Sequence, residues 1–392
     1  MRILYSHQTR AADGQRVHIE GLTAALSDLG HEVRLCGPST SKAPPPHDAM
    51  RRPTRRKGGV LRDLAEWGYG LRGIQRLRQA AKLFTPDIVY ERHALFLEAG
   101  RAVAKAHGVP LLLEVNAPLA QERRQEGQLR LRGLAERAEH RVWRAADAVL
   151  PVSEVLAQEI EAAGVPRSRI HVLPNGVAPA QLKISDGTAA RKRYGLGNGV
   201  VVGFVGFVRP WHGVDLVLDW MATPGGHSAT LVIVGDGPAI PQLQAKAAAL
   251  NLSERMVVTG AVPQGEVTSL IASFDIALQP ASTPYASPLK LQEYMAQARA
   301  IVAPDQPNIR EVLTDGANAL LVPPGDEGAL FQAMDGLMAQ PDLRARLGHA
   351  ARQTVIDRDL TWAGNARRVS EIAAHLLAER RESGHQSVAE PR

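Results

Sequence analysis

Hydrophobic residues recur with two different spacings along this chain, and segments of the two kinds alternate. Short runs of Val, Ile and Leu predict strands covered on both faces, and apolar residues three or four positions apart predict helices. The strands predicted in the first half are Met1–Ser6, Glu32–Cys36, Asp87–Tyr90, Leu111–Val115, Ala148–Val152 and Arg169–Leu173. Those predicted in the second half are Val200–Val205, Thr230–Val234, Met256–Val258, Ile276–Leu278, Ala300–Ala303 and Ala319–Val322.

This alternation predicts an α/β fold with two doubly wound parallel sheets in tandem. The short connections favour right-handed strand–helix–strand units, and Gly30 stands where the first helix would be capped. We expect one Rossmann-like domain over residues 1–182 and another over 183–360, facing each other across a cleft at the carboxyl ends of the strands. Residues 361–392 are expected to form a helix with a frayed tail, either on the second domain or crossing back to the first.

Composition narrows the class of protein. The chain has 392 residues, of which 45% are hydrophobic and 22% charged, as in ordinary globular proteins. A single cysteine, Cys36, excludes an internal disulfide framework, and no apolar run reaches the roughly 20 residues that span a bilayer. The apolar stretch at the start is too short for a signal peptide, so we expect a cytoplasmic protein.

Charge is distributed unevenly between the two halves. Residues 1–182 hold 27 Lys and Arg against 19 Asp and Glu, a net charge of +8, whereas residues 183–392 have a net charge of −2. Part of the excess lies in 38–59, a Pro- and Arg-rich segment expected to be an exposed, mobile loop that includes Arg51–Lys57. A second basic cluster, expected on a helix, consists of Arg123, Arg124, Arg130 and Arg132. Few aromatic residues lie between these charges, so nucleic acid is not an expected partner.

The segment GFVGFVRPWHG, Gly203–Gly213, carries groups suited to phosphate. Arg209 and His212 fall in a loop between a strand and a helix, where free N–H groups and the helix dipole attract anions. The guanidinium of Arg209 is a forked donor that matches phosphate oxygens. The alternative is that Arg209 is a solvated loop charge and His212 a helix-capping residue.

The segment SPLKLQE, Ser287–Glu293, has the signature of a helix start. We expect Ser287 to cap the helix and Pro288 to occupy its first position, which would leave the N–H groups of Leu289 and Lys290 free to bind an anion. Lys290 and Glu293 would share one face of the helix. The alternative is an ordinary capped helix with one surface ion pair.

Two further sets of residues fall at the carboxyl ends of predicted strands. In the second half, GDGP (Gly235–Pro238) allows a sharp turn or a close approach to a ligand, but it lacks the full Gly-x-Gly-x-x-Gly fingerprint, which gives little support to a nicotinamide dehydrogenase. In the first half, polar groups of Gly14–His18, Tyr90–His93 and Glu114–Asn116 converge and suggest a polyhydroxylated ligand. The sequence has no recognisable metal motif, so we expect a reaction that needs no metal.

Motifs over nearly the whole chain resemble the retaining glycosyltransferases of family 4, which have the GT-B fold of two Rossmann-like domains. The matching segments, in order, are GQRVHIEGLTAALSDLGHEV, VLPNGV, GFVRPWHG, LVIVGDGP, TGAVPQGEV, SPLKLQEYMAQARAIVAPD and NALLVPPGD. The resemblance implies that the first domain binds the acceptor and that the second binds a nucleotide-sugar donor.

The resemblance assigns donor roles to residues of the second half. Arg209 and Lys290 match the basic residues at the donor diphosphate and are the implied catalytic residues. His212 stands where the family commonly has Lys, and it joins Ser287, Pro288 and Leu289 in the implied diphosphate site. Glu293 matches the second acid of the Glu-x7-Glu motif, which binds the ribose hydroxyls. The other residues implied on the nucleoside side are Val262, Gly235 and Asp236.

The acceptor side departs from the family pattern. The first acid of the Glu-x7-Glu motif would fall at position 285, where this chain has Tyr285. Glu114 and Asn116 stand where many members carry a His-Asp pair. The residues expected at the acceptor and the transferred sugar are Gly14, Gln15, His18, Arg92, Glu114, Asn116 and Tyr285.

The function implied is a retaining hexosyl transfer from a UDP- or GDP-sugar to a hydroxyl of a saccharide, a lipid-linked glycan or a small molecule. The nucleotide sugar is a co-substrate, and no cofactor is expected. Two alternatives remain open: a sugar-nucleotide epimerase or hydrolase of the same fold, and a non-catalytic nucleotide-sugar-binding member. If the protein is a transferase, residues 1–182, with their net charge of +8, would meet an anionic acceptor or the inner face of an anionic membrane.

Overall fold

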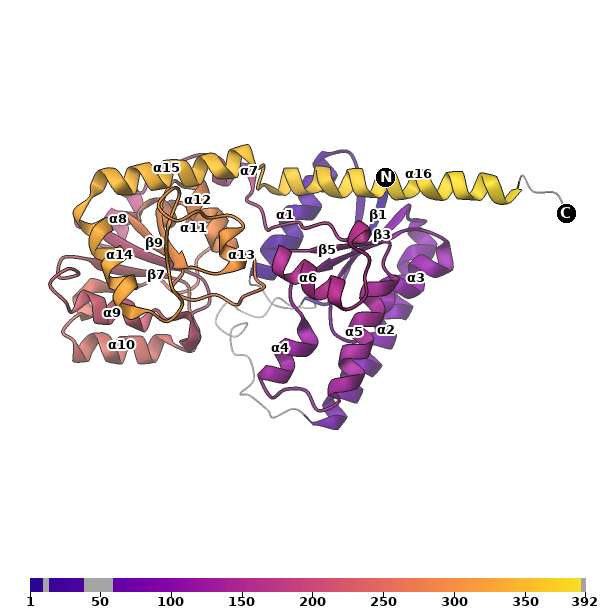
Figure 1. Ribbon diagram of the computed structural model, residues 1–392, viewed down its shortest axis with the longest axis horizontal. Coiled ribbons are helices and arrows are strands. Elements are labelled where there is room, and N and C mark those ends of the chain that lie inside the picture. Colours follow the sequence, from indigo (N-terminus) through magenta and orange to yellow (C-terminus); the bar gives the residue numbers. More distant parts are fainter. Residues whose placement is uncertain (10–13, 39–58, 389–392) are drawn as a thin grey trace. The chain divides into compact units, whose positions relative to one another are not determined.

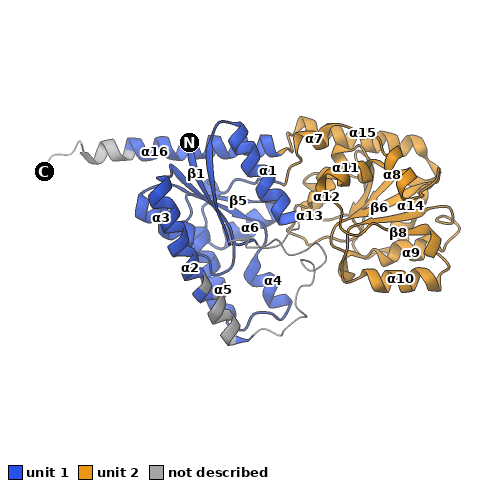
Figure 2. Cartoon of the chain, turned by 180° about the vertical axis from the view of Figure 1, so that it is seen from behind, with its two compact units in different colours: residues 1–45, 51–174, 362–392 blue, residues 46–50, 175–361 orange. Residues whose placement is uncertain are grey.

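The computed structural model describes residues 1–9, 14–38 and 59–388 (Figure 1). The segment 39–58, which holds Arg51–Lys57 and nearly all of the expected exposed loop, lies outside the described residues. The chain divides into two compact units (Figure 2). The described residues up to Pro174 and those from Trp362 onward form unit 1, and Asn175–Thr361 form unit 2. The chain therefore changes unit at Pro174, before the expected boundary at 182, and its C-terminal helix is grouped with unit 1.

Unit 1 contains a five-stranded parallel sheet in the order β2-β1-β3-β4-β5. In the sheet register, Ile3 of β1 lies opposite Val33 of β2 and Ile88 of β3. The strands are β1 (Arg2–Ser6), β2 (Glu32–Cys36), β3 (Ile88–Arg92), β4 (Leu111–Val115) and β5 (Ala148–Pro151). The helices are α1 (Gly14–Asp28), α2 (Val60–Phe84), α3 (Ala99–His107), α4 (Leu119–Gln125), α5 (Arg132–Ala145), α6 (Glu154–Ala162) and α16 (Trp362–Val388), with a 3₁₀ turn, η1, at Arg167–Arg169.

One predicted strand of unit 1 is wrong. Arg169–Leu173 begins in the 3₁₀ turn η1 and forms only an isolated bridge, from Ile170 to Val149. Two backbone N–H groups, of His171 and Leu173, still donate to carbonyls of β5. The segment thus runs beside β5 without becoming a regular strand.

Unit 2 contains a six-stranded parallel sheet in the order β11-β10-β9-β6-β7-β8. The strands are β6 (Val201–Val205), β7 (Thr230–Val234), β8 (Met256–Val258), β9 (Ile276–Leu278), β10 (Ala300–Pro304) and β11 (Leu320–Val322). The helices are α7 (Pro179–Leu182), α8 (Thr188–Arg193), α9 (Asp215–Met221), α10 (Ile240–Ala249), α11 (Gln264–Ala272), α12 (Leu289–Ala296), α13 (Pro307–Arg310), α14 (Glu327–Ala339) and α15 (Pro341–Asp357), and the 3₁₀ turns are η2 (Pro210–His212) and η3 (Ser253–Arg255).

The sheet of unit 2 is buried on both faces, which explains its continuous Val, Ile and Leu strands. Val201 and Val205 of β6 face the core beneath α11, α12 and α15, whereas Val202 and Phe204 face the core beneath α9, α10 and α14. Gly203 lies between them, and a Cβ there would come within 2.2 Å of the Phe274 ring. Packing on the two faces thus fixes the sequence pattern of the strand.

The C-terminal helix α16 packs along α1 in unit 1 (Figure 1). Its first residue, Trp362, is buried, and a Cβ on Gly21 of α1 would come within 2.5 Å of the Trp362 ring. The missing side chain at Gly21 therefore makes room for the indole. Gly30, where the sequence predicts the cap of α1, has φ of +82°, the left-handed conformation that favours glycine.

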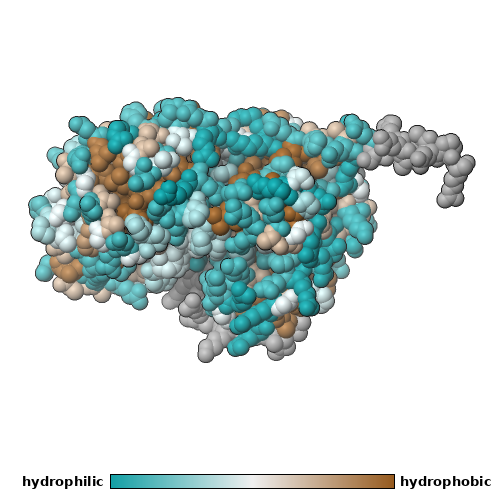
Figure 3. Space-filling view, in the orientation of Figure 1, coloured by the Kyte–Doolittle hydropathy of each residue, from teal (hydrophilic) through white to brown (hydrophobic). Residues whose placement is uncertain are grey.

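Within the described ranges, no helix combines the length and the apolar character needed to cross a membrane. On the face seen in Figure 3, hydrophilic residues predominate and hydrophobic ones form separate patches.

Candidate functional site

Two neighbouring strands of unit 2 bring together residues that are far apart in sequence. β6 and β9 lie side by side, and the chain runs from β6 toward β8 and from β9 toward β11, in opposite directions across the sheet. Such a switch point is where open α/β sheets bind their ligands, beyond the carboxyl ends of the strands. Arg209 follows β6, and Lys290 follows β9 on α12.

After β6, the chain turns so that the His212 side chain meets the backbone of Arg209. The backbone N–H of Arg209 donates to His212 Nδ1 over 2.9 Å, and the imidazole contacts the rings of Phe204 and Trp211. Burial and the charges of Lys290 and Arg209 lower the pKa of His212 to about 3. Because Nδ1 accepts a hydrogen bond, the neutral ring carries its proton on Nε2. His212 can therefore offer an N–H to a ligand but no positive charge.

Lys290 lies over an aromatic ring beside the same loop. Its Nζ is 4.0 Å from the centre of the Phe204 ring, and a Cβ on Gly206 would come within 3.5 Å of this ammonium. Burial lowers the pKa of Lys290 to about 7, although the nearby Glu293 carboxylate opposes the shift. An anion bound here would favour the charged form of the lysine.

The start of α12 differs in two respects from the sequence prediction. The helix begins at Leu289 with Pro288 as its N-cap, and Ser287 does not cap it. Instead, Ser287 Oγ accepts the backbone N–H of Asn175 over 3.1 Å, and the Ser287 carbonyl accepts Asn175 Nδ2 over 2.5 Å. The N–H groups of Leu289 and Lys290, in the first turn, have no acceptor inside the helix. This end of α12 therefore still presents donors next to Lys290.

Glu293 lies one turn further along α12, 8% exposed. Its Oε1 accepts hydrogen bonds from Gln181 Nε2 at 2.9 Å and from Gln264 Nε2 at 3.1 Å. Burial raises the pKa of Glu293, whereas the two amides and the charge of Lys290 lower it. Val262, two residues before Gln264, packs partly buried against the core that contains α11 and α12.

The glycines of the GDGP segment serve a close contact between two loops. Gly235 has φ of +134°, and a Cβ there would lie 2.2 Å from the carbonyl oxygen of Gly206. Gly237 has φ of +158°, and a Cβ there would lie 2.2 Å from the carbonyl oxygen of Val208. The N–H of Val208 donates to the carbonyl of Asp236 over 2.8 Å. The segment after β7 thus holds in place the loop that carries Arg209.

We expect Gly237→Ala to destabilise unit 2 by about 2 kcal/mol or more, because the new Cβ would strain the backbone and collide with a carbonyl. Hydrogen–deuterium exchange of the β6 and β7 amides in increasing urea measures the change. Gly336→Ala is the control, because no atom lies within 4 Å of a Cβ at that position, in the middle of α14. Equal protection in the two variants would contradict the loop contact.

Tyr285 belongs to unit 2, unlike the other residues expected on the acceptor side. It is 8% exposed and lies between β9 and α12. The loop around it is held by Asn308, whose Nδ2 donates to the carbonyls of Thr283 and Ala286 at 3.0 and 2.7 Å. Tyr285 thus lies in the same unit as Lys290 and Glu293, in the part of the chain that follows β9.

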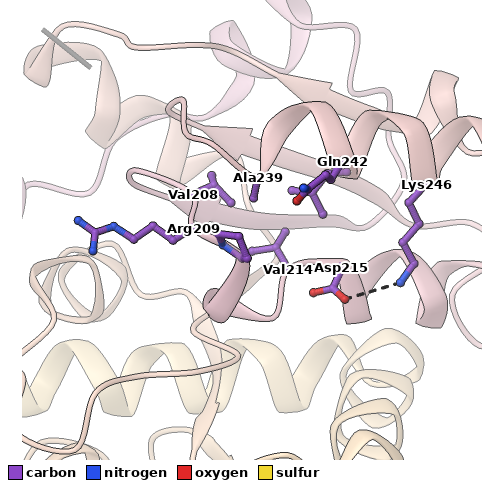
Figure 4. Close-up of a pocket in the computed structure, with 9 residues that line it drawn as sticks. Val208, Arg209, Val214, Asp215, Ala239, Gln242 and Lys246 are labelled. Atoms are coloured by element: carbon purple, nitrogen blue, oxygen red, sulfur yellow. Dashed lines mark ion pairs between the residues drawn. The ribbon is translucent and has the colours of Figure 1, made fainter. Parts of the chain in front are cut away.

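A pocket of about 250 Å³ lies beside the Arg209 turn, against α9 and α10 (Figure 4). The guanidinium of Arg209 extends away from Gln242 and Lys246, which line the pocket. Lys246 is paired with acids, at 2.5 Å from Asp219 and 3.8 Å from Asp215. Arg209 also lines the pocket, but His212, Lys290 and the start of α12 do not. The pocket therefore gathers only one of the residues predicted to bind the diphosphate.

In unit 1, five side chains contact the carboxylate of Glu114 at the end of β4. Tyr90 OH and Tyr5 OH contact Oε2 at 2.9 and 3.3 Å, and His18 Nε2 contacts it at 2.9 Å. Asn116 Nδ2 contacts Oε1 at 2.5 Å, and Arg92 pairs with the same oxygen. The predicted acceptor residues His18, Arg92, Glu114 and Asn116 thus form one cluster. Tyr90 belongs to the YERH motif that the sequence analysis singled out, whereas Tyr5 was missed.

Electrostatics keep the Glu114 carboxylate ionised. Burial would raise the pKa of Glu114, but the charges of His18 and Arg92 and the hydrogen bonds from His18 and Asn116 outweigh it and lower the pKa. Gly14 and Gln15 are exposed at the start of α1, and Gln15 Oε1 accepts the hydroxyl of Thr9 over 3.2 Å. These two residues lie one turn before His18 on the same helix.

Unit 1 also contains a buried pair that sequence reasoning did not find. His93 Nε2 lies 2.9 Å from Glu139 Oε1, and the same carboxylate accepts the N–H groups of Leu119 and Ala120 at the start of α4. His93 was visible in the YERH motif, but Glu139 lies 46 residues away on α5. The basic cluster predicted on one helix spans two: Arg123 and Arg124 lie on α4, and Arg132 starts α5.

Two family models match consecutive parts of the chain. Residues 12–181 match the model "Glycosyltransferase Family 4", and residues 187–354 match "Glycosyl transferases group 1". The chain belongs to glycosyltransferase family 4. The parallel sheets and the ordered motifs of this glycosyltransferase agree with the family resemblance seen in the sequence.

Relatives and solved structures of this glycosyltransferase give the same picture. The chain is 29% identical over 253 residues to the alpha-D-kanosaminyltransferase of Streptomyces kanamyceticus, covering 62% of this chain and 65% of that protein. It is 28% identical over 340 residues to a GDP-mannose-dependent alpha-mannosyltransferase of Mycobacterium tuberculosis, covering 85% of each. The crystal structure of Anabaena HepE in complex with UDP matches with a TM-score of 0.74 at 18% identity, covering 96% of this chain and 100% of HepE. The structural match identifies the fold as GT-B.

Proposed function

We propose that this glycosyltransferase moves a hexosyl group from a UDP- or GDP-sugar to a hydroxyl, with retention of anomeric configuration and without a metal. One observation carries the proposal: Arg209, Lys290 and the start of α12 meet at the switch point between β6 and β9. As the bond to the diphosphate breaks, negative charge grows on the leaving oxygen. Fixed cations and N–H donors at that point stabilise the transition state more than the ground state.

Residues around the diphosphate site would bind the phosphates, the ribose and the base of the donor. His212 Nε2 and the N–H groups of Leu289 and Lys290 would add donors to the phosphate oxygens, and the Ser287–Pro288 backbone would shape the entry to α12. Glu293 would accept hydrogen bonds from the ribose hydroxyls. Val262, Gly235 and Asp236 would lie on the side of the base. The UDP-bound HepE structure and the GDP-mannose-dependent relative support a nucleoside diphosphate of either kind.

Retention is best explained by attack on the face of the leaving group. The acceptor oxygen bonds to the anomeric carbon while the carbon–oxygen bond to the diphosphate breaks, and the acceptor proton passes to a departing diphosphate oxygen. The carboxylate of Glu114 is contacted by five polar side chains and is a poor nucleophile or base, which favours this route. We assign Gly14, Gln15, His18, Arg92, Asn116 and Tyr285 to the acceptor and the transferred sugar.

The positive charge of residues 1–182 favours an anionic acceptor, such as a phosphorylated or lipid-linked saccharide. We propose a cytoplasmic enzyme that meets this acceptor in solution or at the inner face of an anionic membrane. A small-molecule hydroxyl is the third acceptor class of the proposal.

Incubation of the purified protein with UDP- or GDP-hexoses, with and without hydroxyl acceptors and with EDTA, tests the proposal. We expect product only with an acceptor, an unchanged rate in EDTA, and the same anomeric configuration by NMR in donor and product. An inverted product would overturn the retaining mechanism, and a rate abolished by EDTA would overturn metal independence. Conversion of the donor alone would instead show an epimerase or hydrolase, and binding without turnover a non-catalytic member.

A further inference from the structure

Gln181, on the short helix α7, reaches across to α12 and contacts Glu293. Its Nε2 donates to Glu293 Oε1 over 2.9 Å, and its Oε1 accepts the backbone N–H of Ala178 over 2.8 Å. A backbone N–H can only donate and a carboxylate can only accept, so both contacts require the same orientation of the amide. The Gln181 side chain is therefore fixed at both ends.

The backbone around Gln181 is anchored independently of Glu293. Gln297 donates from Nε2 to the carbonyls of Gln181 and Lys183, at 2.5 and 3.1 Å, and its Oε1 accepts the N–H of Ser185 over 3.0 Å. Arg352 donates to the carbonyl of Leu182 and, over 2.7 Å, to that of Ala296. These contacts fasten α7 to the end of α12, so the reach of Gln181 to Glu293 is set by the fold.

Two amides occupy one oxygen of Glu293 and leave the other open. Gln181 and Gln264 both donate to Oε1, and Oε2 accepts no hydrogen bond within the described part of the chain. A hydroxyl donates readily to an ionised carboxylate oxygen, and it loses this partner when a proton takes its place. The amides thus orient the carboxylate and favour the form that a ribose would need.

We propose that Gln181 is a positioning residue of the nucleotide site, which holds Glu293 ionised with Oε2 turned toward a ribose hydroxyl. This inference rests on the proposed role of Glu293 in binding the donor. Burial raises the pKa of Glu293, and Gln181 opposes that rise. Without Gln181 the carboxyl would bind a proton at higher pH, and nucleotide affinity would fall as the pH is lowered.

Few other charges on the neighbouring helices affect the pKa of Glu293. On its own helix, Lys290 lowers its pKa. On α11, Glu266 pairs with Arg193 at 2.8 Å, and on α15, Arg352 is engaged with backbone carbonyls. Lys290 itself titrates near neutral pH, so the informative quantity is the ratio of dissociation constants between variant and wild type at each pH.

Calorimetric titration with UDP and with GDP at pH 6 and pH 8.5 tests the proposal. We expect Gln181→Met, which keeps the side-chain volume, to weaken binding about tenfold at pH 6 and about twofold at pH 8.5. Gln353→Met is the matched control, because Gln353 is exposed on α15 and donates to Asp357 over 2.7 Å. It should leave binding unchanged at both pH values. A pH-independent loss in Gln181→Met would indicate a purely structural role and overturn the proposal.

A second measurement separates this inference from the proposed function. The carboxyl of Glu293 can be followed by ¹³C NMR in the nucleotide-free protein, assigned by the signal lost in Glu293→Gln. Gln181→Met should move its titration to higher pH, and an unchanged titration would overturn the inference. If the wild type bound neither UDP nor GDP, the proposed donor site would fail, and an upward shift of this titration would show that Gln181 acts on Glu293 without serving nucleotide binding.

Discussion

Replacing Lys290 with Ala should reduce turnover about a hundredfold or more while leaving the protein folded. The ammonium lies over the Phe204 ring beside the Arg209 turn, where a leaving diphosphate would gather charge. Preorganised electrostatic groups that meet developing charge are worth roughly 10²–10³ in rate. Steady-state kinetics with a nucleotide sugar, together with thermal unfolding, measures both expectations. Arg209→Ala should change the rate in the same direction.

The same lysine should govern how binding depends on pH. Its pKa is lowered to about 7 in the folded protein, and a bound diphosphate would raise it again. Above pH 7, binding of UDP or GDP then takes up a proton, so affinity should fall by at most about tenfold per pH unit. In Lys290→Ala this slope should disappear.

Stability should show the opposite trend with pH. Between pH 7 and the ordinary lysine pKa of 10.5, the unfolded chain binds more protons than the folded one. The free energy of unfolding of the nucleotide-free protein should therefore rise with pH across this window, and Lys290→Ala should flatten the rise.

Lys246→Ala is the matched control for Lys290. Lys246 is a lysine of the same unit, but it lies on α10, lines the pocket beside the Arg209 turn and pairs with Asp219. Partly exposed ion pairs contribute little, so this variant should keep its rate. Equal losses in both lysine variants, or a normal rate in Lys290→Ala, would refute the diphosphate assignment.

The sequence pattern predicts most strands because their hydrophobicity reflects burial on both faces of a sheet. Leu111–Val115 and Thr230–Val234 have the predicted bounds, and both are parallel strands. Arg169–Leu173 has a similar apolar alternation but does not form a strand. Its path is decided by the 3₁₀ turn before it, η1, and by the edge of β5, and local composition does not report either.

The sequence predicts those residues of the candidate site that lie in loops directly after predicted strands. It does not predict the contacts between these loops. The position of Arg209 follows from the strand–loop–helix order around β6. The contacts that hold the site join residues far apart: Asn175 with Ser287, and Gln181 with Glu293, are each 112 positions apart. Hydrogen bonds at that separation leave no periodic trace in one sequence. The same holds for Tyr5, 109 positions from Glu114.

Removing the carboxylate of Glu114 should destabilise unit 1 severely. In Glu114→Leu, Arg92 and His18 would stay buried without their shared anion, and two tyrosine hydroxyls would lose an acceptor. Breaking a buried ion pair from one side costs about 3–5 kcal/mol. Hydrogen–deuterium exchange in β4, with β6 of unit 2 as the internal reference, measures the loss where it occurs. Glu136→Leu, which breaks an exposed pair with Arg124, should change it little.

Glu114→Gln separates the charge of this residue from its shape. Because folding lowers the pKa of Glu114, its contribution to stability is complete above the ordinary carboxyl pKa of 4.5 and declines as the pH falls below it. Glu114→Gln should therefore be destabilised at pH 7 and should lose part of the wild type's sensitivity to acid.

If Glu114 only organises Arg92, His18 and Asn116, a properly folded Glu114→Gln should raise the KM for the acceptor more than it lowers kcat. A large fall in kcat at unchanged KM would instead make Glu114 a participant in the transfer and contradict attack assisted by the diphosphate alone.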